Sequence, residues 1–219
     1  MPEEETGLAL WEERALERSL APARARSSSQ VHRLVDAARN LAAEIGPGFT
    51  IVQVAARAGM SLKTLYRNFS GKDALLLAVF EEDNRNGADA LASRIARHES
   101  PVERLRAFVL GLFELSTGRP NHYIALVMRE YFRLSVEHAE QVEQVLEPYV
   151  DLLATELEAA AAQGAIRVSD ARREAAAVFL LTVSHVCPLV LADQELDTAD
   201  TANFVAGFCL RAQGSVSGL

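Results

Sequence analysis

Hydrophobic residues recur at three- and four-residue steps along most of the chain, which places them on one face of an α-helix. The segment 27–45 is a clear case, because Ser27, Ser28 and Ser29 offer an N-terminal cap and Gly46-Pro47-Gly48 ends the periodic run. Its apolar face consists of Val31, Leu34, Val35, Ala38, Leu41, Ala42 and Ile45. Residues 1–24 form an arm whose leucines and Trp11 could line a short amphipathic helix, which Pro22 is expected to interrupt.

Two short helices follow this segment. Thr50 opens the first and is followed three residues later by Gln53, which is the spacing of a capping box. Gly59 supplies a left-handed turn residue near the end of that helix, and Ser61 then caps a second one. Ser70 and Asp73 repeat the box-like spacing, and we expect a long helix from there towards His98.

The spacing within this pair predicts a helix-turn-helix. Ala55 is small, which allows a close crossing, while Leu65 can fill the angle between two helices joined by a turn that contains Gly59. In this motif the second helix enters the major groove of DNA with its N-terminal residues at the base edges. The residues expected on its outer face are hydrogen-bonding or cationic: Ser61, Lys63, Thr64, Tyr66, Arg67 and Asn68. A plain helical hairpin with a solvated face is the alternative.

The rest of the chain is also expected to be helical, with short connections and no sign of strands. Glycine, proline and capping aspartate residues, including Asp170 and either Asp197 or Asp200, separate the segments. The expected helices span about 101–115, 122–134, 137–162 and 171–191, with a last one ending near 214 and a break at 118–121. We therefore predict an all-α fold with an arm at 1–24, a DNA-binding domain at 25–72 and a helical ligand-binding and dimerisation domain at 73–219.

The distribution of charge supports a nucleic-acid-binding module. The 219-residue chain has a net charge of −8, yet residues 24–72 contain eight basic and only two acidic residues. Such a basic block within an acidic protein is typical of a small DNA-binding unit joined to another domain. The acidic N-terminus and the two cysteines favour a cytoplasmic protein with reduced thiols. The uncharged run 175–192 contains polar residues and a proline, which favours a buried interface helix over a membrane span.

Catalytic and metal-binding signatures are absent from the sequence. There is no nucleophile elbow, no Walker or Rossmann glycine pattern and no His-Glu-x-x-His, and the five histidines are scattered. We therefore expect neither an enzyme nor a cofactor or metal site. A helical enzyme or small-molecule carrier remains one rival reading, and an architectural DNA-binding protein without an effector is another.

The segment FTIVQVAARAGMSLKTLYRNFSGKDALLLAVF resembles the DNA-binding segment of the tetracycline-repressor (TetR) family of bacterial transcription regulators. The resemblance covers about residues 28–80 and implies a homodimer, a palindromic operator and a ligand-responsive C-terminal domain. It implies phosphate contacts for Thr50, Thr64, Tyr66 and Lys72, and base-edge contacts for Ser61, Leu62 and Lys63. Leu62 departs from the common pattern, since a polar or basic residue often stands there. It could meet thymine methyl groups or pack inward.

Two further sites are expected in the C-terminal half. An apolar or amphipathic effector is expected to bind within each subunit, in a pocket lined by some of Phe108, Phe113, Tyr123, Met128 and Tyr131. The last two helices are expected to form the dimer interface through Val178, Leu181, His185, Phe204 and Phe208. Together these features predict a transcriptional regulator, in the first place a repressor that a small molecule releases from DNA.

Overall fold

A computed structural model describes residues 10–117, 121–191, 198–212 and 214. The described residues contain helices and turns but no strand, as the sequence predicted. A short 3-10 turn, η1, spans Gly46–Gly48. The α-helices are α1 (Leu10–Ile45), α2 (Ile51–Arg57), α3 (Leu62–Asn68), α4 (Lys72–Ile95), α5 (Pro101–Thr117), α6 (Asn121–Glu137), α7 (Ala139–Ala162), α8 (Ala171–Leu191) and α9 (Thr198–Ala212).

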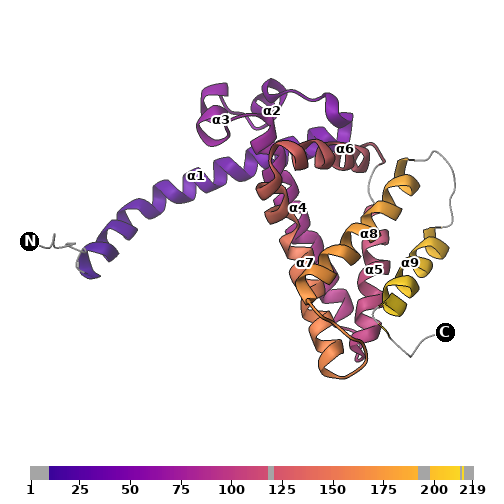
Figure 1. Ribbon diagram of the computed structural model, residues 1–219. Coiled ribbons are helices and arrows are strands. Elements are labelled where there is room, and N and C mark those ends of the chain that lie inside the picture. Colours follow the sequence, from indigo (N-terminus) through magenta and orange to yellow (C-terminus); the bar gives the residue numbers. More distant parts are fainter. Residues whose placement is uncertain (1–9, 118–120, 192–197, 213, 215–219) are drawn as a thin grey trace, which may run out of the picture.

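The helices form a small N-terminal unit and a larger bundle that share one core. In the bundle α4 packs on α7 and α5, α7 packs on α8, and α5 packs on α9. Helix α4 runs directly from the N-terminal unit into this bundle, and α6 lies across the junction, where it contacts α1 (Figure 1). The largest fully buried side chains are Leu34, Phe49, Leu65, Leu75, Leu76, Leu91, Ile95, Phe108, Phe113, Leu126, Leu134 and Leu153.

Helix α1 differs from its sequence prediction. It is one 36-residue helix that includes Pro22 and the three serines, and its first half projects away from the rest of the molecule (Figure 1). Proline removes one backbone hydrogen bond, but its fixed φ is compatible with a helix, so the expected interruption does not occur. Residues 1–9, positions 118–120 of the expected break at 118–121 and the candidate cap Asp197 lie outside the described residues, whereas Asn121 begins α6.

The expected cap of α4 is also wrong. The residue at the cap position is Gly71, and no side chain accepts a hydrogen bond from the first turn. Asp73 instead forms an ion pair with Arg133 of α6. The prediction of Asp170 as a cap is confirmed, because its Oδ1 accepts a hydrogen bond from the Arg173 amide at 3.0 Å. Within the described residues no helix is long and apolar enough to cross a bilayer.

Candidate DNA-binding and effector sites

Local sequence fixes the geometry of α2 and α3. The capping box at Thr50 is present, with the Gln53 amide N–H donating to Thr50 Oγ1 at 3.3 Å and Gln53 Oε1 accepting from the Thr50 amide at 2.8 Å. Ser61 Oγ accepts from the amide of Thr64 at 3.1 Å and so caps α3. Gly59 has a φ of +64°, a conformation that other residues adopt at a cost.

The two helices meet closely at small and apolar residues. Ala55 and Leu65 are both buried, Leu65 completely. The Met60 amide donates to the Ala55 carbonyl at 2.9 Å across the turn. Arg33 of α1 donates a hydrogen bond to the carbonyl of Ala58, which ties α1 to the end of α2. These contacts hold α3 at a fixed angle to α2, as the sequence spacing predicted.

The outer face of α3 presents the side chains that a groove reader requires. Lys63 and Arg67 are exposed, and Tyr66 is 56% exposed. Leu62 is 40% exposed, so it points outward and does not pack into the core. Thr64 is half-buried. Arg67 also donates a hydrogen bond to Gln30 Oε1 of α1 at 2.9 Å, which orients its guanidinium.

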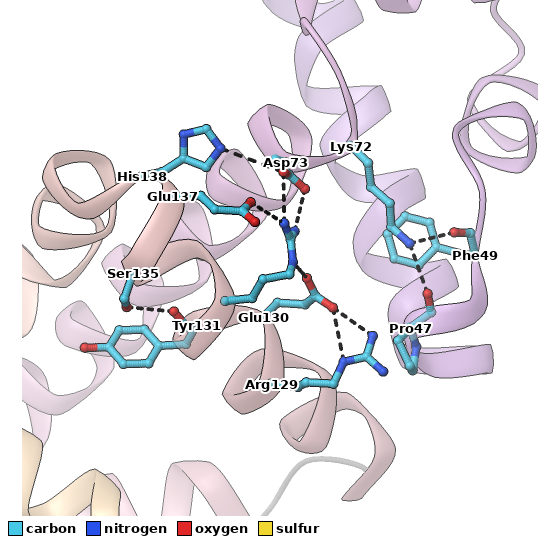
Figure 2. A network of polar contacts seen from close by, with 11 residues as sticks. Pro47, Phe49, Lys72, Asp73, Arg129, Glu130, Tyr131, Ser135, Glu137 and His138 are labelled. Carbon is cyan, nitrogen blue, oxygen red and sulfur yellow. Dashed lines mark hydrogen bonds and ion pairs between the residues drawn. The ribbon is translucent and has the colours of Figure 1, made fainter.

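Lys72 has an internal role that the sequence did not indicate. Its ammonium group donates to the carbonyls of Pro47 and Phe49, at 3.0 and 2.8 Å, and lies over the Phe49 ring (Figure 2). Partial burial lowers the pKa of the Lys72 ammonium from its ordinary value. Lys72 therefore fastens the start of α4 to the chain between α1 and α2. The expected phosphate contact stays a prediction, and the geometry makes it secondary.

An ion-pair network joins the first turn of α4 to α6 (Figure 2). Arg133 contacts Asp73 at 2.5 Å and Glu130 at 2.8 Å, and Arg129 contacts Glu130 at 2.7 Å. Hydrogen bonding from Arg133 lowers the pKa of Asp73. Burial would raise the pKa of Glu130, but its hydrogen bonds to Arg129 and Arg133 outweigh burial and lower that pKa. The bundle is thus coupled to the helix that follows α3.

Asp73, Glu137 and His138 bring three possible metal-ligand atoms within 4.8 Å of one another. Arg133 donates hydrogen bonds to both carboxylates of this group. Because the guanidinium already supplies the positive charge there, ion pairing accounts for the cluster.

A second polar junction lies deeper, between α1, α4 and α6. Asp83 of α4 is 8% exposed; its Oδ1 accepts from Arg39 Nε at 2.7 Å and its Oδ2 accepts from the Tyr123 hydroxyl. Arg39 also contacts Glu82 at 2.7 Å. A buried carboxylate needs such partners. The junction links α1 of the N-terminal unit to the centre of the bundle.

Several cavities lie among α4 to α9, and the largest of them, about 1180 Å³, lies between α4 and α7 with many polar residues in its lining. Two others are mainly apolar. The larger, about 580 Å³, opens between α6, α7 and the start of α8. The smaller, about 90 Å³, lies inside the bundle beside Asp83 and Gly87. Apolar side chains line most of both cavities, and the larger is of the size that proteins use for small molecules.

Comparison with known proteins gives the same reading. The family model "Bacterial regulatory proteins, tetR family" matches residues 34–79, and the model "Tetracyclin repressor-like, C-terminal domain" matches residues 98–186. The first match contains the helix-turn-helix, and the second contains most of the cavity-lining helices. The chain belongs to the TetR family of transcription regulators. It is thus a DNA-binding transcriptional regulator.

Several relatives of this TetR-family regulator are known. It is 26% identical to the fatty acid metabolism regulator protein of Bacillus subtilis (strain 168) over 175 residues, which are 78% of this chain and 89% of that protein. The crystal structure of FadR from Bacillus subtilis with stearoyl-CoA superposes with a TM-score of 0.68 at 24% identity, covering 82% and 97% of the two chains. RolR, solved with resorcinol, gives a TM-score of 0.65 at 20% identity, covering 88% and 91%.

The five residues expected to line an effector pocket of the TetR-family protein do not gather around one cavity. Met128 lines the smaller cavity, and Tyr131 lines the larger. Phe108, Phe113 and Tyr123 are buried and line neither. Their aromatic character could not separate core from cavity, because both are apolar. Phe179, which lines both cavities, was missed because nothing in its local pattern distinguishes it from the other apolar residues of α8.

The residues expected at the dimer interface of the TetR-family protein differ in exposure. Phe204 and Phe208 are exposed and stack with their ring centroids 6.5 Å apart on the outer face of α9. Val178 is half-buried and lines a very small cavity with Leu153. The remaining two, Leu181 and His185, are half-buried. Among the large apolar residues of α8 that the structure describes, Leu180 is exposed, at 46%, and the predicted interface stays a prediction.

Proposed function

We propose that this protein is a repressor that binds a roughly palindromic operator as a homodimer and is released by a long-chain acyl thioester. The observation that carries the DNA-binding part is the capped helix α3, which presents Lys63, Tyr66 and Arg67 to solvent. These side chains lie within a basic block of an otherwise acidic chain. A helical enzyme or carrier has no need of such a face.

The dimer places two copies of α3 on one side of DNA. Two recognition helices must lie one helical turn of DNA apart, ~34 Å, to read both half-sites. Phe204, Phe208 and Leu180 supply an exposed apolar surface that a second copy would cover. Changes in bundle packing would alter the separation of the two α3 helices and so lower operator affinity.

The effector class is inferred from the cavity and from the relatives. The larger cavity is mostly apolar with charged residues at its rim, which suits an amphipathic molecule. One relative is a fatty acid metabolism regulator, and one similar structure contains stearoyl-CoA. The ion pair between Asp73 and Arg133 and the pair between Arg39 and Asp83 connect this bundle to the DNA-binding unit. A ligand that repacks α6 would therefore reach α3 through α4 and α1.

The DNA-binding part is tested by selecting a binding site from random duplexes and measuring affinity against salt concentration. Lys63→Ala should relax sequence preference and cost about 1–3 kcal/mol on the selected site. Arg97→Ala removes the same charge at an exposed position just beyond the end of α4 and serves as the matched control. Equal behaviour of the two variants on selected and random DNA would refute α3 as the reader.

The effector part is tested by titrating the operator complex with stearoyl-CoA, free CoA and resorcinol. We expect stearoyl-CoA alone to release the DNA. A tenfold loss of operator affinity, about 1.4 kcal/mol, requires an equal loss of stearoyl-CoA affinity when operator is bound. Release by resorcinol alone would replace the acyl thioester with an aromatic effector. Binding of DNA that no small molecule changes would favour an architectural protein.

A further inference from the structure

The two cavities share one wall. Phe179 of α8, 5% exposed, lines both the larger and the smaller cavity. Its ring stacks on Tyr149 of α7, with centroids 5.2 Å apart and planes 22° from parallel. Tyr149 lines the smaller cavity only. The Phe179 side chain therefore lies between the two spaces.

The two cavities contact successive segments of two helices, in opposite chain order on the two. On α8 the larger cavity contacts residues 172–180, and the smaller contacts Phe179 and Val183. On α6 the larger contacts Tyr131 and Ser135, and the smaller contacts residues 124–128. Arg173 and Val183 are ten residues apart on α8, or about 15 Å. The two spaces together thus extend along α8, as an extended chain requires.

The larger cavity, at the outer end, is lined by a cationic side chain that could bind an anionic group. Within the described residues the guanidinium of Arg173 makes no hydrogen bond or ion pair, whereas Arg172 contacts Glu147 and Asp151. Glu143 and Asp170 also line the rim, so its charges are mixed. An anionic head group would find its partner in Arg173.

The smaller cavity, at the inner end, is too small to hold a ligand by itself. A volume of about 90 Å³ holds only a few water-sized groups. Its walls are mainly apolar, with Leu112, Leu115, Ile124, Val127, Met128 and Val183 among them. The carboxylate of Asp83 borders it and is already held by Arg39 and Tyr123. These walls suit the end of a hydrocarbon chain.

We propose that Phe179 divides a single acyl-chain site into two compartments and sets its dependence on chain length. This inference rests on the proposed function and adds the position of the ligand. The head group of the thioester lies beside Arg173, and the chain runs along α8. Chains long enough to pass the displaced Phe179 ring fill the inner compartment beside Asp83. Shorter chains stay in the outer compartment.

Chain-length dependence is the quantity that tests the division. Each buried CH2 group strengthens binding by about fourfold, so three groups in the inner compartment add roughly 50-fold. Calorimetric titration with octanoyl-, myristoyl- and stearoyl-CoA should show affinity rising with length in the wild type. Phe179→Trp should abolish the last part of this increase and leave octanoyl-CoA affinity within about threefold.

Phe179→Leu provides the opposite change with little loss of core volume. It should open the wall and raise stearoyl-CoA affinity relative to octanoyl-CoA. Phe108→Leu is the matched control, because Phe108 is equally buried but lines neither cavity. Thermal unfolding of each variant confirms that it is folded. If the Phe179 variants change affinity for all lengths equally, or if no acyl-CoA binds the wild type, the division is wrong.

The head-group position has its own test. Arg173→Ala should weaken stearoyl-CoA binding by about tenfold but leave the uncharged N-acetylcysteamine thioester unaffected. Arg167→Ala, another exposed arginine, is the control. Operator release is measured separately. If acyl-CoA releases the operator but the Phe179 variants change affinity for all chain lengths equally, only the division by Phe179 is overturned. If acyl-CoA binding depends on chain length but does not release the operator, only the proposed effector role is overturned.

Discussion

The ammonium of Lys72 lies 4.2 Å from the centroid of the Phe49 ring. In sequence, Phe49 comes just before the helix-turn-helix and Lys72 comes just after it. Phe49 is almost fully buried, and its carbonyl also accepts a hydrogen bond from the same ammonium. The two residues close the helix-turn-helix into a loop that is anchored at both ends. The position of Lys72 in the sequence implies a phosphate contact, but in the structure its main contacts hold the start of α4 against the chain between α1 and α2.

Lys72→Met should lower the free energy of unfolding by about 2 kcal/mol, because two charge-assisted hydrogen bonds and a cation–π contact are lost. Operator affinity should fall while its salt dependence stays the same. Urea unfolding and salt-dependent DNA binding measure the two quantities. If stability is unchanged and the salt slope falls by about one, Lys72 is a phosphate contact instead.

Phe208→Asp should dissociate the proposed dimer, since it places an unpaired charge in an apolar interface. The expected cost is on the order of 3 to 5 kcal/mol where the side chain is fully buried by the partner. Phe132→Asp is the matched control, because Phe132 is also an exposed aromatic, at 64%, but lies on α6. Sedimentation velocity distinguishes them. If the Phe132 variant is monomeric and the Phe208 variant is dimeric, the dimer interface lies on α6 and not on α9.

Arg133→Met should reduce stability at neutral pH by about 1–2 kcal/mol, because it leaves the largely buried carboxylate of Glu130 with one partner. Both Asp73 and Glu130 have lowered pKa values. Their stabilisation is therefore complete above about pH 4, near the unfolded-state pKa, and is lost as pH falls through the folded-state values.

Wild type and the Arg133 variant should accordingly converge in acid. Urea unfolding from about pH 3 to pH 7 measures the difference. Arg85→Met, which breaks an exposed ion pair with Glu81, is the control and should cost at most about 0.5 kcal/mol. A constant difference between wild type and the Arg133 variant at all pH values would mean that lost packing, and not the ion pairs, causes the effect.

Gly87→Ala should destabilise the bundle by about 1–3 kcal/mol through overpacking. A Cβ atom at Gly87 would lie 1.9 Å from the Tyr149 hydroxyl oxygen. Tyr149→Phe removes that oxygen, so the double variant should recover part of the loss. Gly48→Ala, where no atom lies within 4 Å of the added Cβ, is the control. Thermal unfolding of the wild type, the two single variants and the double variant forms a cycle, and strict additivity would disprove the contact.

Local sequence predicts the DNA-binding unit well because its signals act over three or four residues. The Thr50 and Ser61 caps, the turn at Gly59 and the burial of Leu65 all follow from the spacing. The exposure of Leu62 did not, because a leucine at the start of a helix fits either environment. The cap at Ser70 does not form, because Gly71 occupies the cap position and the Asp73 carboxylate pairs with Arg133, 60 residues away.

Long-range relations account for the rest of what the sequence did not predict. The chain contains many apolar residues at helical spacing, and only packing separates Phe108 in the core from Phe179 between two cavities. The junction of Arg39 with Asp83 joins α1 to α4 across 44 residues. On α8, Val178 is half-buried and lines a very small cavity, whereas Leu180 is exposed, and periodicity alone did not separate the two. Helical periodicity shows which residues share a helix face, but it does not show whether that face lies against the core, a cavity or the solvent.

The continuity of α1 turns a small motion at Arg39 into a large one at its far end. Leu10 and Arg39 belong to one helix and are separated by 29 residues, or about 44 Å. A helix of this kind behaves as a stiff rod, so a tilt of about 5° at Arg39 would carry Leu10 through about 4 Å. A small tilt of α1 caused by a rearrangement around the buried carboxylate of Asp83 would therefore produce a displacement of several ångströms at the projecting end of α1.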